Sequence, residues 1–360
     1  MTEIGKTFMR EALSLARRGL GTTSPNPMVG AVVVRAGEII GRGFHQKAGE
    51  PHAEPNAIND CEINDLSECE LYVTLEPCCH TNKRTPPCTS LIIEKGIRKV
   101  HVATLDPNPS VSGKGVEVLE SVGVQVSVGL LEKEAAALNE VFNKTILSNL
   151  PYVHLKLAQT LDGKLATLSG DSKWITDESA RTRVHELRLK YDAVMVGRNT
   201  LNNDDPSLDI RMGIDAKDKV PFRIILGNPE KFKMDSKVLS DDYVGKTIII
   251  STSNILGKNE EVLKEKGIKV IKFNESLSES LKELKELGVQ SILVEGGARL
   301  AKDFIAQELY DRMTLFVAPK MIGKGLSYLN LDKERMQDAL TFENVEVSVL
   351  GNQAVFDIRR

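Results

Sequence analysis

The sequence predicts an α/β protein that folds into two domains. Short apolar runs of strand length alternate along the chain with segments whose apolar residues recur at helical spacing. At 360 residues the chain is long for one hydrophobic core and sufficient for two. Pro151 follows a long helical pattern and would end it. We therefore predict a linker at Ser148-Asn149-Leu150-Pro151 and domains at residues 1–148 and 149–360.

The first half shows helical and extended patterns in alternation. Apolar residues at positions 8, 9, 12, 13 and 16 predict a helix over residues 7–18. The β-branched run at residues 28–34 predicts a strand that is buried on both faces. By the same criteria we predict strands at residues 39–44, 71–75, 99–104 and 124–128, and helices at residues 53–59, 89–95, 116–122 and 131–147. This order indicates a three-layer α/β domain.

The second half predicts a mostly parallel sheet that finishes in an antiparallel edge. Asp162-Gly163 is a hairpin signal between a strand at residues 152–158 and an extended segment at residues 164–168. The remaining strands are predicted at residues 192–197, 222–226, 247–251, 269–273, 291–295, 313–319, 345–350 and 354–358. Helices are predicted at residues 179–191, 278–287 and 298–308.

Composition favours a small free substrate over a macromolecular one. The net charge of -3 and the pI near 6.2 argue against a nucleic-acid-binding surface, which would carry a basic excess. No window approaches 18 apolar residues, and the first ten residues lack the apolar core of a signal peptide. We expect a cytoplasmic protein that has no membrane partner and whose cysteines stay reduced.

Three short motifs carry the clearest chemistry: His52-Ala53-Glu54, Glu76-Pro77-Cys78 and Pro86-Pro87-Cys88. One histidine and two cysteines can hold Zn²⁺ and leave the fourth tetrahedral position to water, as in zinc deaminases of nucleobases. The metal lowers the pKa of that water to about 7. Glu54 would then take the proton of the water and deliver it to the ring nitrogen and the departing ammonia.

A closed structural zinc site is the main alternative, with His80 or Cys79 as the fourth ligand. The two cysteines lie ten positions apart, unlike the two-residue gap of the usual deaminase signature, and the loop between them carries His80, Lys83 and Arg84. Such a loop could place cations over an anionic group such as a phosphate. All 5 cysteines lie between positions 61 and 88, beside His52, which favours a metal over packing.

Four other features are compatible with a binding site but also have simpler explanations. Asn26 between two prolines fits a pocket wall or a turn cap. The turn Asp106-Pro-Asn-Pro109 follows a strand, where ligands gather in open sheets, or is simple turn chemistry. Trp174, the only tryptophan, lies in a Gly/Ser loop and could cover a flat ring or anchor a core. Gly296-Gly297, between a strand and a helix, fits a phosphate cradle or a tight turn.

The order of motifs resembles the bifunctional bacterial deaminase–reductase family of riboflavin biosynthesis along nearly the whole chain. The motifs of the first half are Ser24-Pro-Asn-Pro-Met-Val-Gly30, His52-Ala-Glu54, Thr74-Leu-Glu-Pro-Cys78, Thr85-Pro-Pro-Cys88 and Asp106-Pro-Asn-Pro109. Those of the second half are Leu161-Asp-Gly163, Gly170-Asp-Ser-Lys-Trp-Ile-Thr176, Asp204-Asp-Pro206 and Val294-Glu-Gly-Gly297. The resemblance implies a cytidine-deaminase-like fold followed by a dihydrofolate-reductase-like fold.

The resemblance also implies the substrate and both reactions. The first domain would hydrolyse the 2-amino group of 2,5-diamino-6-ribosylamino-4(3H)-pyrimidinone 5′-phosphate, and the second would use NADPH to reduce the ribosyl group to ribityl. His52, Cys78 and Cys88 match the zinc ligands, one zinc per chain, and Glu54 matches the proton carrier. Positions that match the pyrimidine and phosphate contacts of the deaminase are Asn26, His45, His80, Arg84, Asp106 and Asn108. A homo-oligomer is also expected.

The reductase positions are carried over in the same way. Ala158, Trp174, Thr200, Asp204, Gly296 and Gly297 resemble the NADPH contacts, and Ser172, Arg188, Leu208, Arg211 and Glu295 resemble the substrate contacts. Arg188 and Arg211 would suit a bidentate clamp on the 5′-phosphate. The electrostatic partner of the reacting centre is Glu295 or Lys156, a choice that the sequence leaves open.

Two departures from the family pattern affect the deaminase half. The loop between Cys78 and Cys88 is one residue longer than usual, and Cys79 stands where the family commonly has serine. We assign Cys78 as the ligand, since adjacent cysteines rarely aim both sulfurs at one metal. Two other functions compete with this assignment: a nucleoside or tRNA deaminase whose second half only binds, and a zinc-stapled scaffold without activity.

Overall fold

The computed structural model describes residues 3–80, 86–253, 257–273, 276–327 and 335–360. The chain divides into two compact units, Met1–Asn149 and Leu150–Arg360, one residue from the boundary that we predicted. No helix among these described residues combines the length and apolarity needed to cross a bilayer. Each unit is built around a sheet of its own.

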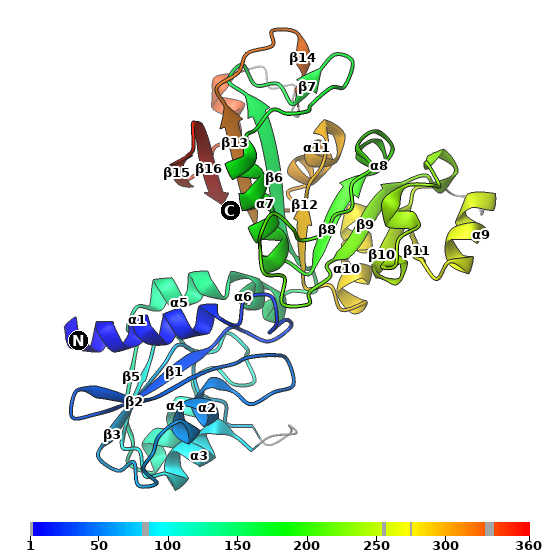
Figure 1. Cartoon of the computed structure of the whole chain (residues 1–360). Helices are drawn as coiled ribbons and strands as arrows, with labels where there is room; N and C mark the ends of the chain where they lie inside the picture. The colour runs from blue at the N-terminus through cyan, green and yellow to red at the C-terminus, as the bar shows by residue number, and fades with distance from the viewer. Residues whose placement is uncertain (1–2, 81–85, 254–256, 274–275, 328–334) are drawn as a thin grey trace. The chain divides into compact units, whose positions relative to one another are not determined.

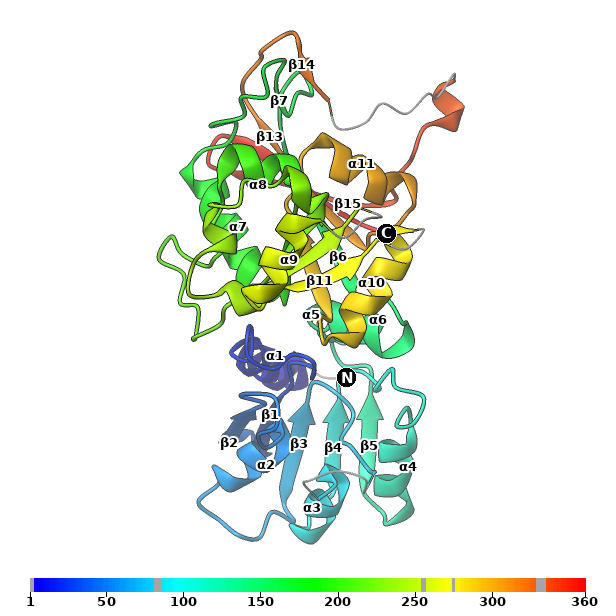
Figure 2. The same ribbon diagram turned by 90° about the vertical axis from the view of Figure 1, so that its right-hand side faces the viewer.

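The sheet of the first unit has five strands in the order β2-β1-β3-β4-β5. Strand β1 pairs antiparallel with both β2 and β3, and the β3, β4 and β5 strands run parallel (Figure 2). The strands are β1 (Gly30–Arg35), β2 (Glu38–Phe44), β3 (Cys69–Val73), β4 (Lys99–Val102) and β5 (Gln125–Val128).

Helices cover both faces of this sheet and make the predicted three layers (Figure 1). One face packs against α2 (Ala53–Asn59), α3 (Cys88–Glu94) and α4 (Lys114–Ser121). The other packs against α1 (Glu3–Arg17) and α5 (Glu132–Leu138), and α6 (Glu140–Leu147) ends the unit. The apolar stripe of α1, from Phe8 to Ala16, is buried as its spacing predicted.

The sheet of the second unit has nine strands in the order β11-β10-β9-β8-β12-β6-β13-β16-β15. The first seven run parallel, and β16 and β15 add the antiparallel edge that we predicted. The strands are β6 (Tyr152–Thr160), β8 (Ala193–Gly197), β9 (Phe222–Gly227), β10 (Thr247–Ser251), β11 (Lys269–Lys272), β12 (Ser291–Val294), β13 (Arg312–Ala318), β15 (Asn344–Leu350) and β16 (Gln353–Arg359).

Five helices accompany this sheet among the described residues: α7 (Glu178–Lys190), α8 (Arg198–Asp204), α9 (Lys258–Glu265), α10 (Leu277–Glu286) and α11 (Ala298–Ala306). Our sequence analysis missed α8 and α9, which are short and polar. Apolar side chains of β6, β8 and β12 pack with those of α10 and α11 in the main core. This core therefore fixes the positions of the strand ends and of the first turns of α10 and α11.

Two predictions about the elements were wrong. The helix expected over residues 131–147 is two helices that meet at Asn139, whose side chain accepts from the backbone N–H of Met28 (2.8 Å) and donates to its carbonyl (2.9 Å). The hairpin strand after Asp162 does not pair with β6. Instead, β7 (Ala166–Thr167) pairs with β14 (Gly325–Leu326), because the carboxylate of Asp162 accepts from the backbone of Gly323 (2.7 Å).

Candidate active sites

Three side chains in the first unit have their ligand atoms gathered as a metal requires. His52 precedes α2, Cys78 follows the end of β3, and Cys88 opens α3. The Nδ1 atom of His52 lies 3.6 Å from the Sγ of Cys78 and 3.3 Å from the Sγ of Cys88. A tetrahedral Zn²⁺ with ordinary Zn–N and Zn–S bonds separates nitrogen and sulfur by about 3.6 Å. The three residues therefore fit zinc without rearrangement.

His52, Cys78 and Cys88, called the metal group below, supply three of the four ligands of a tetrahedral ion. Among the described residues, the histidine, cysteine and acidic side chains whose atoms gather within 4.8 Å of one another are His52, Cys78 and Cys88 alone. His80 and Cys79, the fourth ligands of a closed structural site, lie outside this group. Three protein ligands are the number found in catalytic zinc sites, where water takes the fourth position.

Glu54 lies in the first turn of α2 and lines the same pocket as His52 and Cys78. Its side chain is buried, with 3% of the residue exposed. Burial is the main cause that raises the pKa of Glu54, and the carboxyl group is within hydrogen-bond reach of Cys88. A carboxyl group in such a position can exchange a proton with a bound water and a substrate atom.

The metal group opens into a pocket of about 380 Å³, a volume that suits a small molecule. Most of the deaminase residues predicted from the sequence line it. They are Asn26, His45, His52, Glu54, Cys78, His80, Asp106 and Asn108. Arg84, and Lys83 beside it, lie outside the described residues.

Asn26 and His45 form a pair on one wall of the pocket. The Nδ1 of His45 lies 3.0 Å from the carbonyl of Pro51, to which it donates. The Nε2 is then free to accept from the side-chain amide of Asn26, at 3.1 Å. Burial lowers the pKa of His45, which keeps this tautomer neutral. The pair fixes the amide of Asn26, so that its oxygen is left to accept from a ligand.

Asp106 and Asn108 line another wall, on the loop after β4. The side chain of Asp106 accepts from the backbone N–H of Asn108 (2.9 Å), and that of Asn108 accepts from the N–H of Ser110 (3.0 Å). These are the turn contacts that the sequence offered as the simpler explanation. The loop is therefore ordered by the same side chains that face the pocket.

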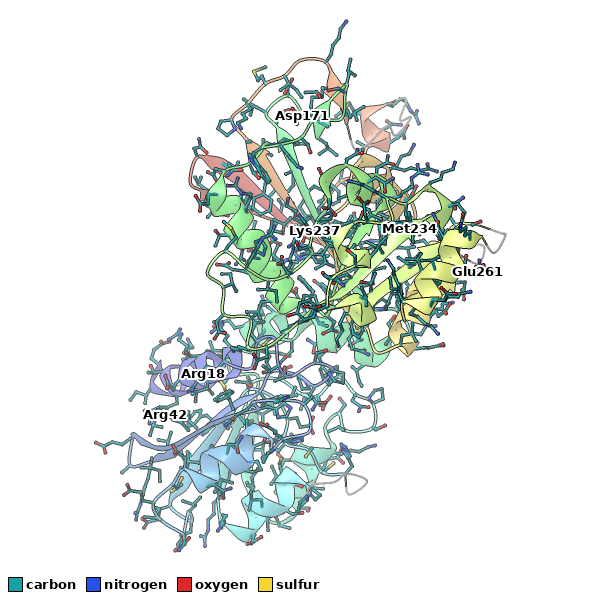
Figure 3. All side chains as sticks on the ribbon, turned by 45° about the vertical axis from the view of Figure 1, so that its right-hand side comes forward. Arg18, Arg42, Asp171, Met234, Lys237 and Glu261 are labelled. Carbon is teal, nitrogen blue, oxygen red and sulfur yellow. The ribbon has the colours of Figure 1, made fainter. Side chains whose placement is uncertain are left out.

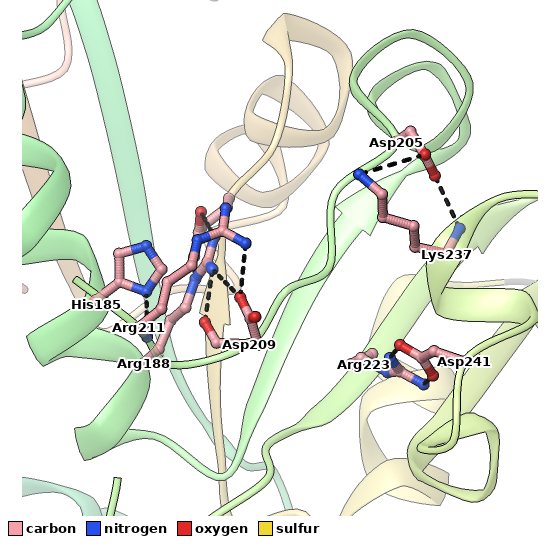
Figure 4. Close-up of polar contacts among 9 residues, drawn as sticks. His185, Arg188, Asp205, Asp209, Arg211, Arg223, Lys237 and Asp241 are labelled. Atoms are coloured by element: carbon pink, nitrogen blue, oxygen red, sulfur yellow. Dashed lines mark hydrogen bonds and ion pairs between the residues drawn. The ribbon is translucent and has the colours of Figure 1, made fainter. Parts of the chain in front are cut away.

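In the second unit, the predicted clamp residue Arg188 is engaged by protein. Its Nε and one terminal nitrogen bond both oxygens of Glu295, at 2.6 and 2.8 Å, and the other donates to the carbonyl of Asp209 at 2.8 Å (Figure 4). Burial opposes the charge of Glu295, but Arg188 holds the pKa of that carboxyl below its ordinary value. The guanidinium fork that we expected to grip a phosphate is thus filled by a carboxylate, a pairing that sequence cannot show.

Arg211 differs from Arg188 in its exposure. Its side chain is 56% exposed and pairs with Asp209 at 3.1 Å, while its backbone N–H donates to His185 at 3.1 Å (Figure 4). Burial lowers the pKa of His185 to about 4, so the ring is a neutral acceptor. Lys156 is half-buried, and desolvation lowers its pKa against the attraction of Glu295. Both candidates for the reacting centre, Glu295 and Lys156, therefore lie in one partly buried group of charges.

The remaining reductase positions are spread over several elements. Trp174 is 62% exposed, and Arg181 lies 4.7 Å from the centre of its ring. It follows a loop that contains Asp171 (labelled in Figure 3). The side chain of Asp171 accepts from the backbone N–H of Lys173 at 3.1 Å. Ser172 lies in this loop, Ala158 on β6, and Thr200 and Asp204 on α8. Asp204 forms an ion pair with Lys173 at 3.5 Å.

Leu208, Gly296 and Gly297 would contact a ligand through their backbone. Leu208 has a left-handed φ of 55°, and its side chain is packed in a core cluster. Gly297 caps α11 and supplies no side-chain hydrogen bond to it, so the first N–H groups of that helix are open to an anion. A helix start of this kind is what an anion-binding site requires.

The structure also adds pocket residues that the sequence analysis did not identify. Phe142 and Ile146 of α6 line the deaminase pocket, as does Glu76 at the end of β3. The spacing of Phe142 and Ile146, one helical turn apart, marked them only as part of an apolar helix face. Glu76 was part of a motif but had no role assigned to it.

Comparisons with known proteins agree with both halves of the chain. Residues 2–104 match the cytidine and deoxycytidylate deaminase zinc-binding region, and residues 151–356 match the RibD C-terminal domain. The riboflavin biosynthesis protein RibD of Aquifex aeolicus is 46% identical over 361 residues, which cover 99% of each chain.

Solved structures give the same result over the full length. RibD of Acinetobacter baumannii is 35% identical, with a TM-score of 0.89 over 99% of each chain. A diaminohydroxyphosphoribosylaminopyrimidine deaminase/5-amino-6-(5-phosphoribosylamino)uracil reductase of Thermotoga maritima is 38% identical, with a TM-score of 0.86 over 99% of this chain and 98% of that one. The chain therefore belongs to the RibD family of riboflavin biosynthesis, in which a zinc-binding deaminase domain and a reductase domain form one bifunctional enzyme.

Proposed function

We propose that residues 1–148 deaminate 2,5-diamino-6-ribosylamino-4(3H)-pyrimidinone 5′-phosphate and that residues 149–360 reduce the product to 5-amino-6-ribitylamino-uracil 5′-phosphate with NADPH. One observation carries the proposal: the His52, Cys78 and Cys88 group, with buried Glu54 beside it, opens into a pocket for a small molecule. The two family domains and the relatives' names support the assignment of the reactions.

In the deaminase, the chain's own residues hold the metal and move the proton. His52, Cys78 and Cys88 would hold Zn²⁺, which would supply the Lewis acidity that makes a water nucleophilic at neutral pH. The carboxylate of Glu54 would take one proton from the attacking water and pass it to the ring nitrogen. It would then take the second proton, from the hydroxyl group now on the ring carbon, and pass it to the amino group, which leaves as ammonia while the carbonyl forms. The low exposure of Glu54 supports this role, since bulk water would compete for its proton.

The pocket walls hold the pyrimidine. The amide of Asn26, oriented by His45, would accept from a ring amino group. Asp106 and Asn108 present backbone and side-chain polar atoms on the opposite loop. His80 brings a buried ring nitrogen, Nδ1, that has no hydrogen-bond partner among the described residues and could donate to or accept from the substrate. Arg84 would reach the phosphate from the loop before Cys88.

In the reductase, NADPH would supply a hydride to the ribosyl carbon. The open N-terminus of α11 after Gly296-Gly297 would hold a phosphate of the cofactor, and the exposed ring of Trp174 would cover one of its flat groups. Ala158, Thr200 and Asp204 complete the proposed contacts. Lys156 and Glu295, both half-buried and attracted to each other, would stabilise the reacting centre.

The 5′-phosphate of the second substrate would bind Arg211, with Ser172 and the backbone of Leu208 nearby in the proposed site. We now assign the phosphate to Arg211 rather than to both arginines. The exposed guanidinium of Arg211 supports this choice, as does the engagement of every Arg188 nitrogen by protein. Arg188 would instead hold the carboxylate of Glu295 in place.

The test is to incubate the purified chain with the diaminopyrimidine, with and without NADPH. We expect about one zinc per chain, ammonia release without NADPH, and NADPH oxidation only after deamination. Ammonia release from a nucleoside or tRNA but not from the diaminopyrimidine would assign the chain to the competing class of deaminases. Zinc binding without any turnover would make it a scaffold.

A homo-oligomer is also proposed. The edge strand β15 supports it, because Val345, Val347 and Val349 are all exposed on this last strand of the sheet. Exposed apolar edges of this kind commonly pair with another chain. Light scattering that gave the 39.6 kDa mass of one chain would contradict this proposal. The cytoplasmic location stays a prediction.

A further inference from the structure

Glu76 makes an unusual set of contacts at the end of β3. One carboxylate oxygen accepts from the backbone N–H groups of Asp106 (3.1 Å) and Gly113 (3.0 Å). The other accepts from those of Gly115 (2.8 Å) and Val116 (3.3 Å). Only 4% of the residue is exposed, so the carboxylate depends on these four donors for its solvation.

These hydrogen bonds fix the position of residues 106–116, a segment that forms part of the pocket wall. Asp106, the first donor to Glu76, lines the deaminase pocket, and so do Asn108 and Val111, which lie between it and the second donor, Gly113. The last two donors belong to the first turn of α4, whose N-cap, Gly113, supplies no side-chain hydrogen bond. Glu76 thus caps this helix from 39 residues earlier in the chain.

A close backbone approach reinforces the same connection. A Cβ atom at Gly115 would lie 2.2 Å from the carbonyl oxygen of Pro77, which is too close for any side chain. The start of α4 therefore packs directly on the Pro77–Cys78 peptide and on the side chain of Glu76. The residue after Pro77, Cys78, is a proposed metal ligand.

We propose that Glu76 is a positioning residue for deamination: it holds the 106–116 wall of the pocket at a fixed place relative to the metal ligand Cys78. The inference rests on the proposed deaminase function. Because the residues that it places face the substrate, while His52, Cys88 and Glu54 are held by other elements, its loss should affect substrate binding more than the chemical step.

The principal variant is Glu76→Gln. It replaces one oxygen with an NH₂ group, which then faces two N–H donors that it cannot accept from. Leaving buried donors unsatisfied should loosen the wall and raise the deaminase KM about tenfold or more, with kcat changed less than about threefold. Zinc content and the reductase activity of the same chain should be unchanged.

Gly115→Ala tests the connection without changing the carboxylate. Alanine favours a helix over glycine at this helical position, so damage would come from the contacts of the added Cβ with the Pro77 carbonyl (2.2 Å) and the Glu76 side chain (3.1 Å to its Oε1). It should raise the KM in the same direction. Glu70→Gln is the matched control: Glu70 lies on β3 six residues earlier, and its carboxylate bonds the side chains of Tyr72 and His101 rather than the pocket wall.

Hydrogen exchange gives a readout that does not depend on activity. The backbone amides of residues 106–116 should exchange about tenfold faster in Glu76→Gln than in the unmodified chain, and at an unchanged rate in Glu70→Gln. A KM within twofold of the unmodified enzyme, or unchanged exchange in this segment, would overturn the proposal. So would loss of zinc from Glu76→Gln, which would assign the residue to the metal site. If the unmodified chain itself did not deaminate, the proposed function would fail instead.

Discussion

Ligand atoms from His52 and Cys88, which lie 36 positions apart in the chain, come within 3.3 Å of each other in the first unit. In the second unit, the proposed binding residues are spread from β6 to the start of α11. They include an exposed ring, Trp174, and a leucine that is packed in the core, Leu208. The residues of the metal group lie within a few ångströms of one another, whereas the proposed reductase residues are distributed over several elements.

The difference reflects what each site has to hold. A metal ion requires its ligands at bond distance, so the residues around it are few, buried and set by short motifs. The ligands that we propose for the second site, a dinucleotide and a ribosyl phosphate, are long, and many weak contacts along a sheet edge would suffice to bind them. Single substitutions should therefore have large effects in the first unit and smaller ones in the second.

The largest effect is expected from loss of a metal ligand. Cys88→Ser should abolish zinc binding and lower deamination at least about 10⁴-fold, because the water then loses its activation. NADPH oxidation with the deaminated substrate should continue. Cys61→Ser is the control, since Cys61 is a free cysteine outside the metal group. Zinc analysis and ammonia release measure the outcome. A Cys88→Ser enzyme that still bound zinc and deaminated would show that Cys88 is not a required ligand.

Glu54→Gln should lower kcat for deamination by about 10²- to 10⁴-fold, the usual contribution of a general acid–base group. Zinc should stay bound, because Glu54 is not among the ligands. The exposed Glu50, four residues earlier, gives a control variant, Glu50→Gln, with unchanged rates. Deamination at the full rate in Glu54→Gln would refute its proton-carrying role.

The two arginines of the second unit should separate stability from binding. Arg188→Met leaves Glu295 buried without its partner and should destabilise this unit by about 3–5 kcal/mol. Arg211→Met removes an exposed cation and should raise the reductase KM about tenfold with little change in stability. Unfolding can be followed through Trp174, the single tryptophan of the chain, which lies in this unit.

Arg183→Met is the control for Arg211, because Arg183 is also exposed and ion-paired. It should change neither stability nor KM. If Arg188→Met raised the KM without lowering the stability of the unit, Arg188 would be a phosphate clamp after all, and the assignment of the phosphate to Arg211 alone would fail.

The smallest effect concerns acid stability of the second unit. Burial lowers the pKa of His185 to about 4, below its ordinary value of 6.5. Between these values the unfolded chain binds a proton that the folded chain does not, so stability is complete above pH 6.5 and is lost progressively as the pH falls towards 4. In His185→Asn the denaturation midpoint should depend less on pH over this window. An equal dependence in both proteins would remove His185 as a cause.

Much of the architecture followed from pattern, but several of its details did not. Alternating apolar runs predicted the strands and the antiparallel edge of the second sheet, because burial on one or two faces imposes a period on the chain. The break at Asn139 was missed, since its cause is a pair of hydrogen bonds to Met28, 111 residues away. The pairing of β7 with β14 was also missed, because the partner strand lies far away in the sequence.

The candidate sites divide in a similar way. His52, Glu54, Cys78 and Cys88 were found because metal chemistry demands particular residue types in short motifs. The ion pair of Arg188 with Glu295 and the four hydrogen bonds of Glu76 were not predicted. The sequence does not distinguish an arginine or a glutamate that faces a ligand from one that binds a buried protein group.

By itself the sequence determined the two α/β halves and the residues that can bind a metal, since hydrophobic period and ligand chemistry are properties of local stretches of chain. Only the tertiary structure decided which charged groups are left for a substrate and which hold the walls of the pocket. That choice depends on hydrogen bonds between residues far apart in the chain, and on how much water each charge retains once the chain has folded.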